Sequence, residues 1–213
     1  MKLVSTINDL QRELAAARAE GKSIGFVPTM GALHSGHASL VRYSTADNDI
    51  TVVSIFVNPT QFNDSSDLQK YPRTPEADYQ LLESLDTSFV FIPEVSEMYP
   101  EPDTRVFCFD PLDAVMEGKY RTGHFSGVAQ IVSKLFDAVQ PDRAYFGEND
   151  YQQLAIIREM VRQLDYKIAI IGCPIVREPD GLARSSRNAR PSDKERNIAL
   201  KISQTLFKST NLA

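Results

Sequence analysis

Short apolar runs rich in β-branched and aromatic residues alternate along the chain with segments whose apolar residues recur at helical spacing. The runs are typical of buried strands, and the periodic segments are typical of helices that pack on one face. Strands are expected at residues 24–27, 50–56, 89–92, 105–109, 144–146 and 168–171. Helices are expected at 8–20, from about 37 onward, and at 75–85, 128–139, 154–164 and 192–206; the proline-rich segment 93–103 is expected to be irregular.

The alternation of strands and helices predicts the α/β class, with a Rossmann-like parallel sheet that helices cover on both faces. Ligands in such folds bind beyond the carboxyl ends of the strands. Polar clusters follow three of the expected strands, at Met30–His37, Asn58–Asn63 and Gly147–Gln153. We therefore expect these clusters to share one pocket.

The segment after the first of these strands has the features of an anion site. Pro28 is expected to end the strand, because proline has no N–H to give to a sheet ladder. A turn with two glycines then carries His34 and His37 just before a helix begins. Free N–H groups and the positive end of a helix favour phosphate, and two imidazoles add hydrogen-bond donors. The competing interpretation is that both histidines only cap the helix.

Composition and charge narrow the functional classes. The chain has 213 residues, 42% of them hydrophobic, which suits one large domain or one domain plus a fragment. The formal net charge of −5 argues against a sequence-independent nucleic-acid binder, which needs a basic face. No apolar run approaches the roughly 20 residues of a membrane span, so no membrane partner is expected. Cys108 and Cys173 form no Cys-x-x-Cys pair, and we expect two buried thiols in a reduced, cytoplasmic setting.

Six blocks, in the same order along residues 3 to 196, resemble the pantoate–β-alanine ligase family of the nucleotidyltransferase superfamily that carries the His-x-Gly-His (HIGH) motif. The blocks are Pro28–His37, Ser54–Phe62, Tyr71–Thr74, Gly123–Ala129, Phe146–Leu154 and Asp180–Asn188. The resemblance implies an ATP-dependent ligase of pantothenate and coenzyme A biosynthesis. In the implied reaction the carboxylate of (R)-pantoate attacks the α-phosphorus of ATP, and β-alanine then displaces AMP from pantoyl adenylate. The resemblance also implies Mg²⁺ that accompanies the nucleotide, no metal site built by the protein, and a cytoplasmic homodimer.

The same resemblance assigns residues to the substrates. It implies that Gln61 and Gln153 bind pantoate and that Gln61 also contacts β-alanine. A carboxamide can hold a hydroxy acid without a charge that would weaken its carboxylate as a nucleophile. His37, with His34, is implied as the catalytic group that donates to a phosphate oxygen. The positions implied to contact ATP are Met30, Gly31, Ala32, Leu33, His34, Ser35, Gly36, His37, Gly147, Glu148, Asn149, Asp150, Val176, Arg184, Ser185, Ser186 and Arg187.

The chain departs from the family at position 149, where Asn149 replaces the usual lysine and cannot neutralise phosphate charge. Arg184, where the family usually has methionine or leucine, is a candidate for the compensating cation. His124 is expected to be structural or close to the substrate rather than catalytic. Simpler interpretations compete for several residues: Gln61 and Gln153 as exposed loop amides, Arg184 and Arg187 as surface charges, and Val176 as core.

Family members usually continue into a smaller C-terminal domain that covers the site. We expect residues 1–175 to form the domain that binds ATP and pantoate, and residues 176–213 to begin a truncated lid domain. Two alternative functions stay open. One is another small-molecule nucleotidyltransferase of the superfamily, which would neither need Gln61 nor consume β-alanine. The other is a catalytically weakened binding form, motivated by Asn149 and by the incomplete lid.

Overall fold

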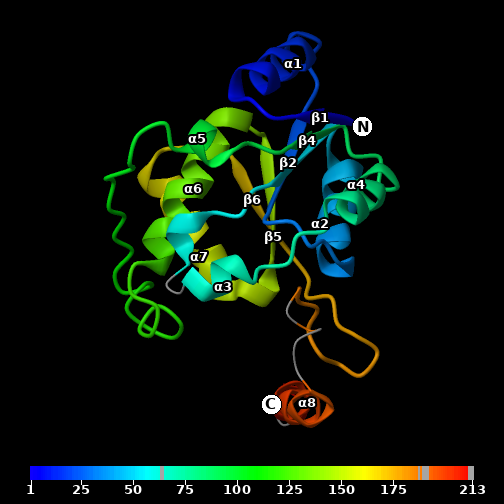
Figure 1. The fold of residues 1–213 in the computed structure, drawn as a ribbon, viewed down its shortest axis with the longest axis vertical. Helices are drawn as coiled ribbons and strands as arrows, with labels where there is room; N and C mark the ends of the chain where they lie inside the picture. The colour runs from blue at the N-terminus through cyan, green and yellow to red at the C-terminus, as the bar shows by residue number, and fades with distance from the viewer. Residues whose placement is uncertain (63–64, 187, 189–191, 211–213) are drawn as a thin grey trace.

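The computed structural model describes residues 1–62, 65–186, 188 and 192–210. Within them, six strands form one parallel sheet in the order β1-β4-β3-β2-β5-β6 (Figure 1). The strands are β1 Lys2–Val4, β2 Ile24–Thr29, β3 Ile50–Ile55, β4 Phe89–Phe91, β5 Arg143–Gly147 and β6 Ala169–Cys173. The expected α/β class and parallel sheet are confirmed.

Helices cover both faces of the sheet (Figure 1). The helices are α1 Ile7–Ala19, α2 Ser35–Asp47, α3 Ser65–Gln69, α4 Pro75–Glu83, α5 Val95–Met98, α6 His124–Val139, α7 Tyr151–Gln163 and α8 Asp193–Thr210, with short 3₁₀ turns at Pro59–Gln61 (η1) and Glu148–Asp150 (η2). Within the described residues, no helix combines the length and the apolar character that crossing a bilayer requires.

Two hydrophobic cores lie on opposite faces of the sheet. The larger core joins α1, α6 and α7 to the strands, and the smaller one joins α2 and α4. Successive side chains of a strand point to opposite faces, so Phe26 belongs to the larger core and Val27 to the smaller one. Both residues are fully buried, which explains why the sequence of β2 is a continuous apolar run.

The order of the strands reverses between β2 and β5. From β2 the chain builds outward through β3 and β4, and it later returns to place β5 and β6 on the other side of β2. The carboxyl ends of strands beside such a reversal form the crevice in which doubly wound folds bind ligands. The topology therefore predicts a ligand-binding site at the carboxyl ends of β2 and β5.

Pro28 does not end its strand, contrary to the expectation from its missing N–H. The carbonyl of Ile24 accepts from Asp142 on the β5 side, whereas the carbonyl of Thr29 accepts from Phe56 on the β3 side. Because partners alternate along a parallel strand, Pro28 directs its nitrogen toward β5. The β2–β5 ladder stops at Phe26, two residues earlier, so no ladder bond is lost at the proline.

The segment Arg105–Phe109 was expected to be a strand and is an irregular loop. Side chains of α6 take the backbone bonds that a neighbouring strand would have made. The N–H of Phe107 donates to the Ser126 hydroxyl at 3.1 Å, and the carbonyl of Arg105 accepts from the Gln130 amide at 2.6 Å. The apolar composition of Arg105–Phe109 therefore does not indicate that this segment pairs with a strand.

Three other expectations also need correction. The short strand β1 at the sheet edge and the one-turn helix α5, within the segment expected to be irregular, were both missed. Cys173 is buried as expected, but Cys108 is exposed. It lies in the same irregular loop, which keeps part of its length on the surface.

Candidate active site

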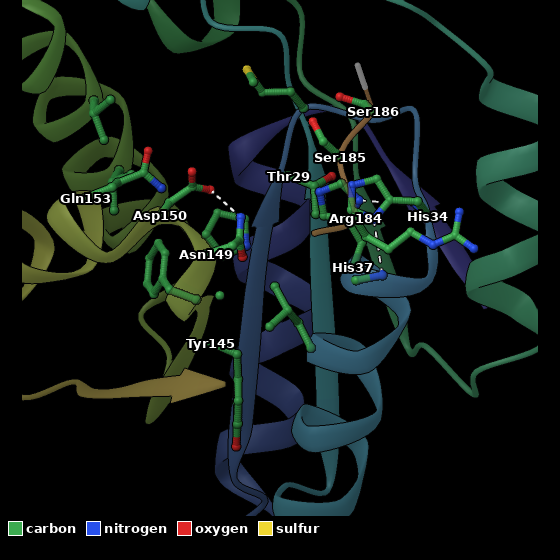
Figure 2. A pocket seen from close by; sticks show the side chains of 18 of the residues that line it. Thr29, His34, His37, Tyr145, Asn149, Asp150, Gln153, Arg184, Ser185 and Ser186 are labelled. Carbon is green, nitrogen blue, oxygen red and sulfur yellow. Dashed lines mark hydrogen bonds between the residues drawn. The ribbon is translucent and has the colours of Figure 1, made fainter. Parts of the chain in front are cut away.

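A cavity of about 250 Å³ opens beyond the carboxyl ends of β2, β3 and β5 (Figure 2). The residues expected to bind substrates that line it are Met30, His34, Gly36, His37, Gln61, Gly147, Asn149, Asp150, Gln153, Val176, Arg184, Ser185 and Ser186. Five residues expected to contact ATP are not among its lining: Gly31, Ala32, Leu33, Ser35 and Glu148. Arg187, also expected to contact ATP, lies outside the described residues. The structure thus brings residues from all three predicted polar clusters to one place.

Asp78 of α4 holds the turn that follows β2. Its carboxylate, 2% exposed, accepts hydrogen bonds from the N–H groups of Ala32 at 2.9 Å and Leu33 at 2.8 Å. Thr74 donates its hydroxyl to the same carboxylate at 3.1 Å. Gly31 and Ala32 both have positive φ, +79° and +49°, a conformation that costs a non-glycine residue energy. Asp78 therefore fixes a strained turn behind the cavity, which explains why this turn does not line it.

His34 and His37 cap α2 with the same ring nitrogen. Nδ1 of His34 accepts from the N–H of Gly36 at 3.1 Å, and Nδ1 of His37 accepts from the N–H of His34 at 3.3 Å. The two rings stack with centroids 4.0 Å apart. Because both Nδ1 atoms are acceptors, the proton of each neutral imidazole is on Nε2. The capping and the ligand-binding interpretations are therefore compatible, since each uses a different nitrogen.

Both imidazoles are neutral near pH 7. Desolvation inside the protein lowers the pKa of His37 to about 3, with a smaller contribution from His34, although His37 keeps part of its surface open. Burial, followed by the charge of Arg184, lowers the pKa of His34. Each histidine can therefore present a neutral Nε2–H to an anion. This narrows the expected role of His37 to that of a hydrogen-bond donor rather than a charged acid.

Asn58 positions Gln61 at the end of β3. Asn58 is 1% exposed; its amide donates to Gly127 O at 3.2 Å and to Gln61 Oε1 at 3.3 Å. Its own oxygen accepts from the Tyr99 hydroxyl at 2.7 Å. The Gln61 amide nitrogen lies 3.0 Å from the sulfur of Met30, across the cavity mouth between β3 and β2. Gln61 is therefore held by neighbours and is not a free loop amide.

The start of α6 supports the same loop from the other side. His124, 6% exposed, donates from Nδ1 to the carbonyl of Gln61 at 3.0 Å, which fits the expected structural role. A Cβ on Gly127 would lie 2.8 Å from the carbonyl oxygen of Thr60. Only glycine allows α6 to approach η1 this closely.

The segment after β5 forms the opposite wall of the cavity. Asn149 donates to the Asp150 carboxylate at 3.0 Å, and Gln153 follows on the first turn of α7. Figure 2 shows Asn149, Asp150 and Gln153 facing the two imidazoles across the cavity. Glu148 turns away, toward Gly172 of β6.

Ser185 and Ser186 lie above the end of β2, and Arg184 lies beside the imidazoles (Figure 2). The segment leaves the sheet after β6 through a narrow hairpin in which Arg177 bridges Ala183. The guanidinium of Arg184 pairs with Glu178 at 3.2 Å.

One wall of the cavity is apolar. It consists of side chains from α6 together with one residue that follows β3: Val128, Ile131, Val132, Leu135 and Phe56. A ligand with an anionic end and a branched hydrocarbon part would match these two kinds of wall.

Sequence reasoning missed Asp78, and it placed Asn58 in the polar cluster after β3 without giving that residue a role of its own. Nothing local marks Asp78, because it acts on backbone N–H groups that a distant turn brings to it. The role of Asn58 depends on Gly127 and Tyr99, which other segments bring to it, as well as on the neighbouring Gln61.

The family model described as pantoate-beta-alanine ligase matches residues 2–212 of this chain. The pantothenate synthetase of Bacteroides thetaiotaomicron is 70% identical over 213 residues, which are 100% of this chain and 76% of that relative. Among solved structures, a pantothenate synthetase from Thermus thermophilus matches with a TM-score of 0.91 at 47% identity, covering 97% of this chain and 74% of that one.

A second solved structure was determined with ligands. The pantoate-beta-alanine ligase of Francisella tularensis, complexed with beta-gamma ATP and beta-alanine, matches with a TM-score of 0.90 at 40% identity, covering 96% of this chain and 78% of that one. The match of the family model along nearly the whole chain, and relatives at this level of identity, lead to one conclusion: the chain belongs to the pantoate–β-alanine ligase family.

Proposed function

We propose that this chain joins (R)-pantoate to β-alanine to give pantothenate, while ATP is converted to AMP and pyrophosphate. The observation that carries the proposal is the meeting of four segments, after β2, β3, β5 and β6, around one cavity. Family membership supplies the identity of the substrates.

In the first step, a carboxylate oxygen of pantoate attacks the α-phosphorus of ATP, and pyrophosphate leaves with the bond electrons, which gives pantoyl adenylate. The substrate brings its own nucleophile, so the protein has to align the groups and stabilise charge on the phosphoryl oxygens. The Nε2–H groups of His34 and His37 and the positive end of α2 are suited to that task.

Pantoate is assigned to the side of the cavity between Gln61, Gln153 and the apolar wall of α6. The two amides would hold its hydroxyl and carboxylate groups, and the wall would accept its two methyl groups. In the second step the amine of β-alanine, beside Gln61, attacks the carbonyl carbon, and AMP leaves with the electrons of the C–O bond.

ATP is assigned to the remaining walls. Ser185, Ser186 and Asn149 would face its phosphates, Gly147 and Asp150 its ribose side, and Val176 its base. No group of three or more His, Cys, Asp or Glu side chains suited to a metal occurs among the described residues. Mg²⁺ fits this site as an ion carried by the phosphates themselves, which is its usual mode in such enzymes.

The test is ATP–pyrophosphate exchange, measured with and without pantoate. Exchange that requires pantoate, followed by pantothenate formation on addition of β-alanine, would support the proposal. Exchange driven only by a different carboxylic acid would favour another nucleotidyltransferase. Nucleotide binding without any exchange would favour the weakened binding form.

We further propose a cytoplasmic homodimer and a division of the chain into residues 1–175 and 176–213. In Figure 1, α8 stands apart from the sheet and its covering helices, which supports the division. Limited proteolysis tests it: early cuts should fall between β6 and α8. Sedimentation equilibrium tests the dimer, and a monomer mass at micromolar concentration would contradict it.

A further inference from the structure

Arg184 is the one lysine or arginine among the described residues that line the cavity. The two histidines there are neutral, Asn149 carries no charge, and Asp150 adds a carboxylate. A nucleoside triphosphate carries several negative charges, and partly buried phosphate is usually balanced by Arg, Lys or a metal ion. Within the described part of the cavity, that demand falls on Arg184.

The backbone of Arg184 is fixed beside the start of α2. Its N–H donates to Val176 O at 2.9 Å, and its Cβ lies 3.7 Å from the position that a Cβ on Gly36 would take. Nε of Arg184 is buried and has no hydrogen-bond partner within the part of the chain that the structure describes, whereas Nη1 pairs with Glu178. Figure 2 shows the side chain running past the two imidazoles. Among the described residues, this guanidinium therefore has one donor, Nε–H, that no protein group accepts.

Glu178 has other partners besides Arg184. Its carboxylate accepts from the Asn188 amide at 3.0 Å and from the guanidinium of Arg196, on α8, at 3.4 Å. If Arg184 moved away, Glu178 would keep these two contacts. The cost of a carboxylate left without partners, which usually holds ion pairs together, would not arise.

We propose that Arg184 pairs with Glu178 in the nucleotide-free protein, and that it leaves this carboxylate and pairs with the phosphate chain when the nucleotide binds. The proposal rests on the proposed binding of ATP in this cavity. Phosphate oxygens match the planar fork of a guanidinium and carry more charge than one carboxylate, so the exchange is favourable. Glu178 thereby sets the affinity for ATP through Arg184 and is a positioning residue.

Titration calorimetry with adenosine, AMP and ATP, in excess Mg²⁺ at fixed salt, tests the exchange. Arg184→Met should weaken ATP binding about tenfold, AMP less, and adenosine not at all, because the contact is to phosphate. Glu178→Gln should tighten ATP binding about threefold, because Arg184 then leaves an uncharged amide, which binds it less strongly than the carboxylate does. In the double variant, Glu178→Gln should add nothing to Arg184→Met.

Arg162→Met and Glu159→Gln are matched controls. These residues form an ion pair at 2.6 Å on α7, outside the cavity lining, and the substitutions change the charge in the same way. Both should leave all three titrations unchanged.

Equal weakening of adenosine, AMP and ATP by Arg184→Met would show a structural role and overturn the proposal. An effect of Glu178→Gln on ATP binding that persists in the Arg184→Met background would show that Glu178 does not act through Arg184, and it would overturn the positioning role of Glu178. Wild-type protein that binds no ATP, even with pantoate present, would overturn the proposed function itself and this proposal with it.

Discussion

Each imidazole that follows β2 caps the helix with one ring nitrogen, and in the proposed function it would donate to substrate with the other. Nδ1 of His34 and of His37 closes the first turn of α2, and this contact leaves Nε2 with the proton. The helix start and the donor pair are therefore built from the same residues. Substitutions that imitate one nitrogen at a time can separate the two tasks.

His37→Asn keeps an acceptor close to the position of Nδ1 and removes the Nε2 donor. We expect the pantoate-dependent exchange rate to fall by roughly 10² or more, as for a lost oxyanion donor. The melting temperature should stay near that of the wild type. His37→Gln is the complement: it retains a distal donor, loses the cap, and should cost about 1 kcal/mol of stability with a smaller loss of rate. Exchange at the wild-type rate in His37→Asn would contradict the assigned role.

Asp78→Asn should destabilise the protein by about 1–3 kcal/mol, because an amide cannot accept from Ala32, Leu33 and Thr74 as the carboxylate does. The exchange rate should fall as well, since the turn sets the start of α2. Urea unfolding and the exchange assay measure the two effects. Asp86 is exposed and follows the C-terminal end of α4, and Asp86→Asn is a control that should change neither the stability nor the exchange rate.

At the scale of elements, most strands and helices could be predicted because each has a local pattern. The apolar run of β3 and the helical spacing in α6 owe their form to burial against the sheet, and burial is visible in the sequence. The segment Arg105–Phe109 has the same apolar composition but bonds to side chains of α6. No local pattern records that choice, because it depends on a partner that arrives from elsewhere in the chain.

The site divides in the same way. The loop with His34 and His37 could be predicted, because its glycines, histidines and helix start are adjacent in the sequence. The hold of Asp78 on that loop joins segments 45 residues apart. Asn58 lies only three residues before Gln61, but it is itself held by Gly127 and Tyr99 from distant segments, and these contacts become visible only in three dimensions. Arg184 could be named as a cation, but its direction and its pairing with Glu178 could not.

The contact between α6 and η1 leads to a prediction about specificity. Gly127→Ala would place a methyl group 2.8 Å from the Thr60 carbonyl oxygen, so the loop that carries Gln61 must move. We expect the KM for pantoate to rise several times more than the KM for ATP. Steady-state kinetics with each substrate varied in turn would measure the split, and an equal rise in both constants would contradict it.

At the scale of the whole molecule, folding lowers the pKa of all three histidines and so favours their neutral forms. Burial is the main cause of the lowered pKa values of His34, His37 and His124. In the unfolded chain these groups bind protons near pH 6.5, whereas folded His37 does so only near pH 3. Between those values the unfolded state holds more protons, so the free energy of unfolding must fall as the pH falls.

We therefore expect stability to be fully present above about pH 7 and to decline below it, with a contribution from His37 of up to roughly 1.4 kcal/mol per pH unit. Urea unfolding between pH 4 and 8 measures the slope. His37→Asn should flatten the slope, because the variant has no group there to protonate. The same slope in both proteins would mean that His37 takes up its proton in the folded state as easily as in the unfolded one.

The short ladder between β2 and β5 has a consequence for how the halves of the sheet hold together. Only Gly25 and Phe26 pair with β5, and beyond them the two strands part around the cavity. A substrate bound in that opening would contact loops from both halves of the sheet and so stabilise one half against the other. Amide hydrogens of β2 and β5 should therefore exchange more slowly once nucleotide and pantoate are bound, with the greatest slowing where the strands diverge.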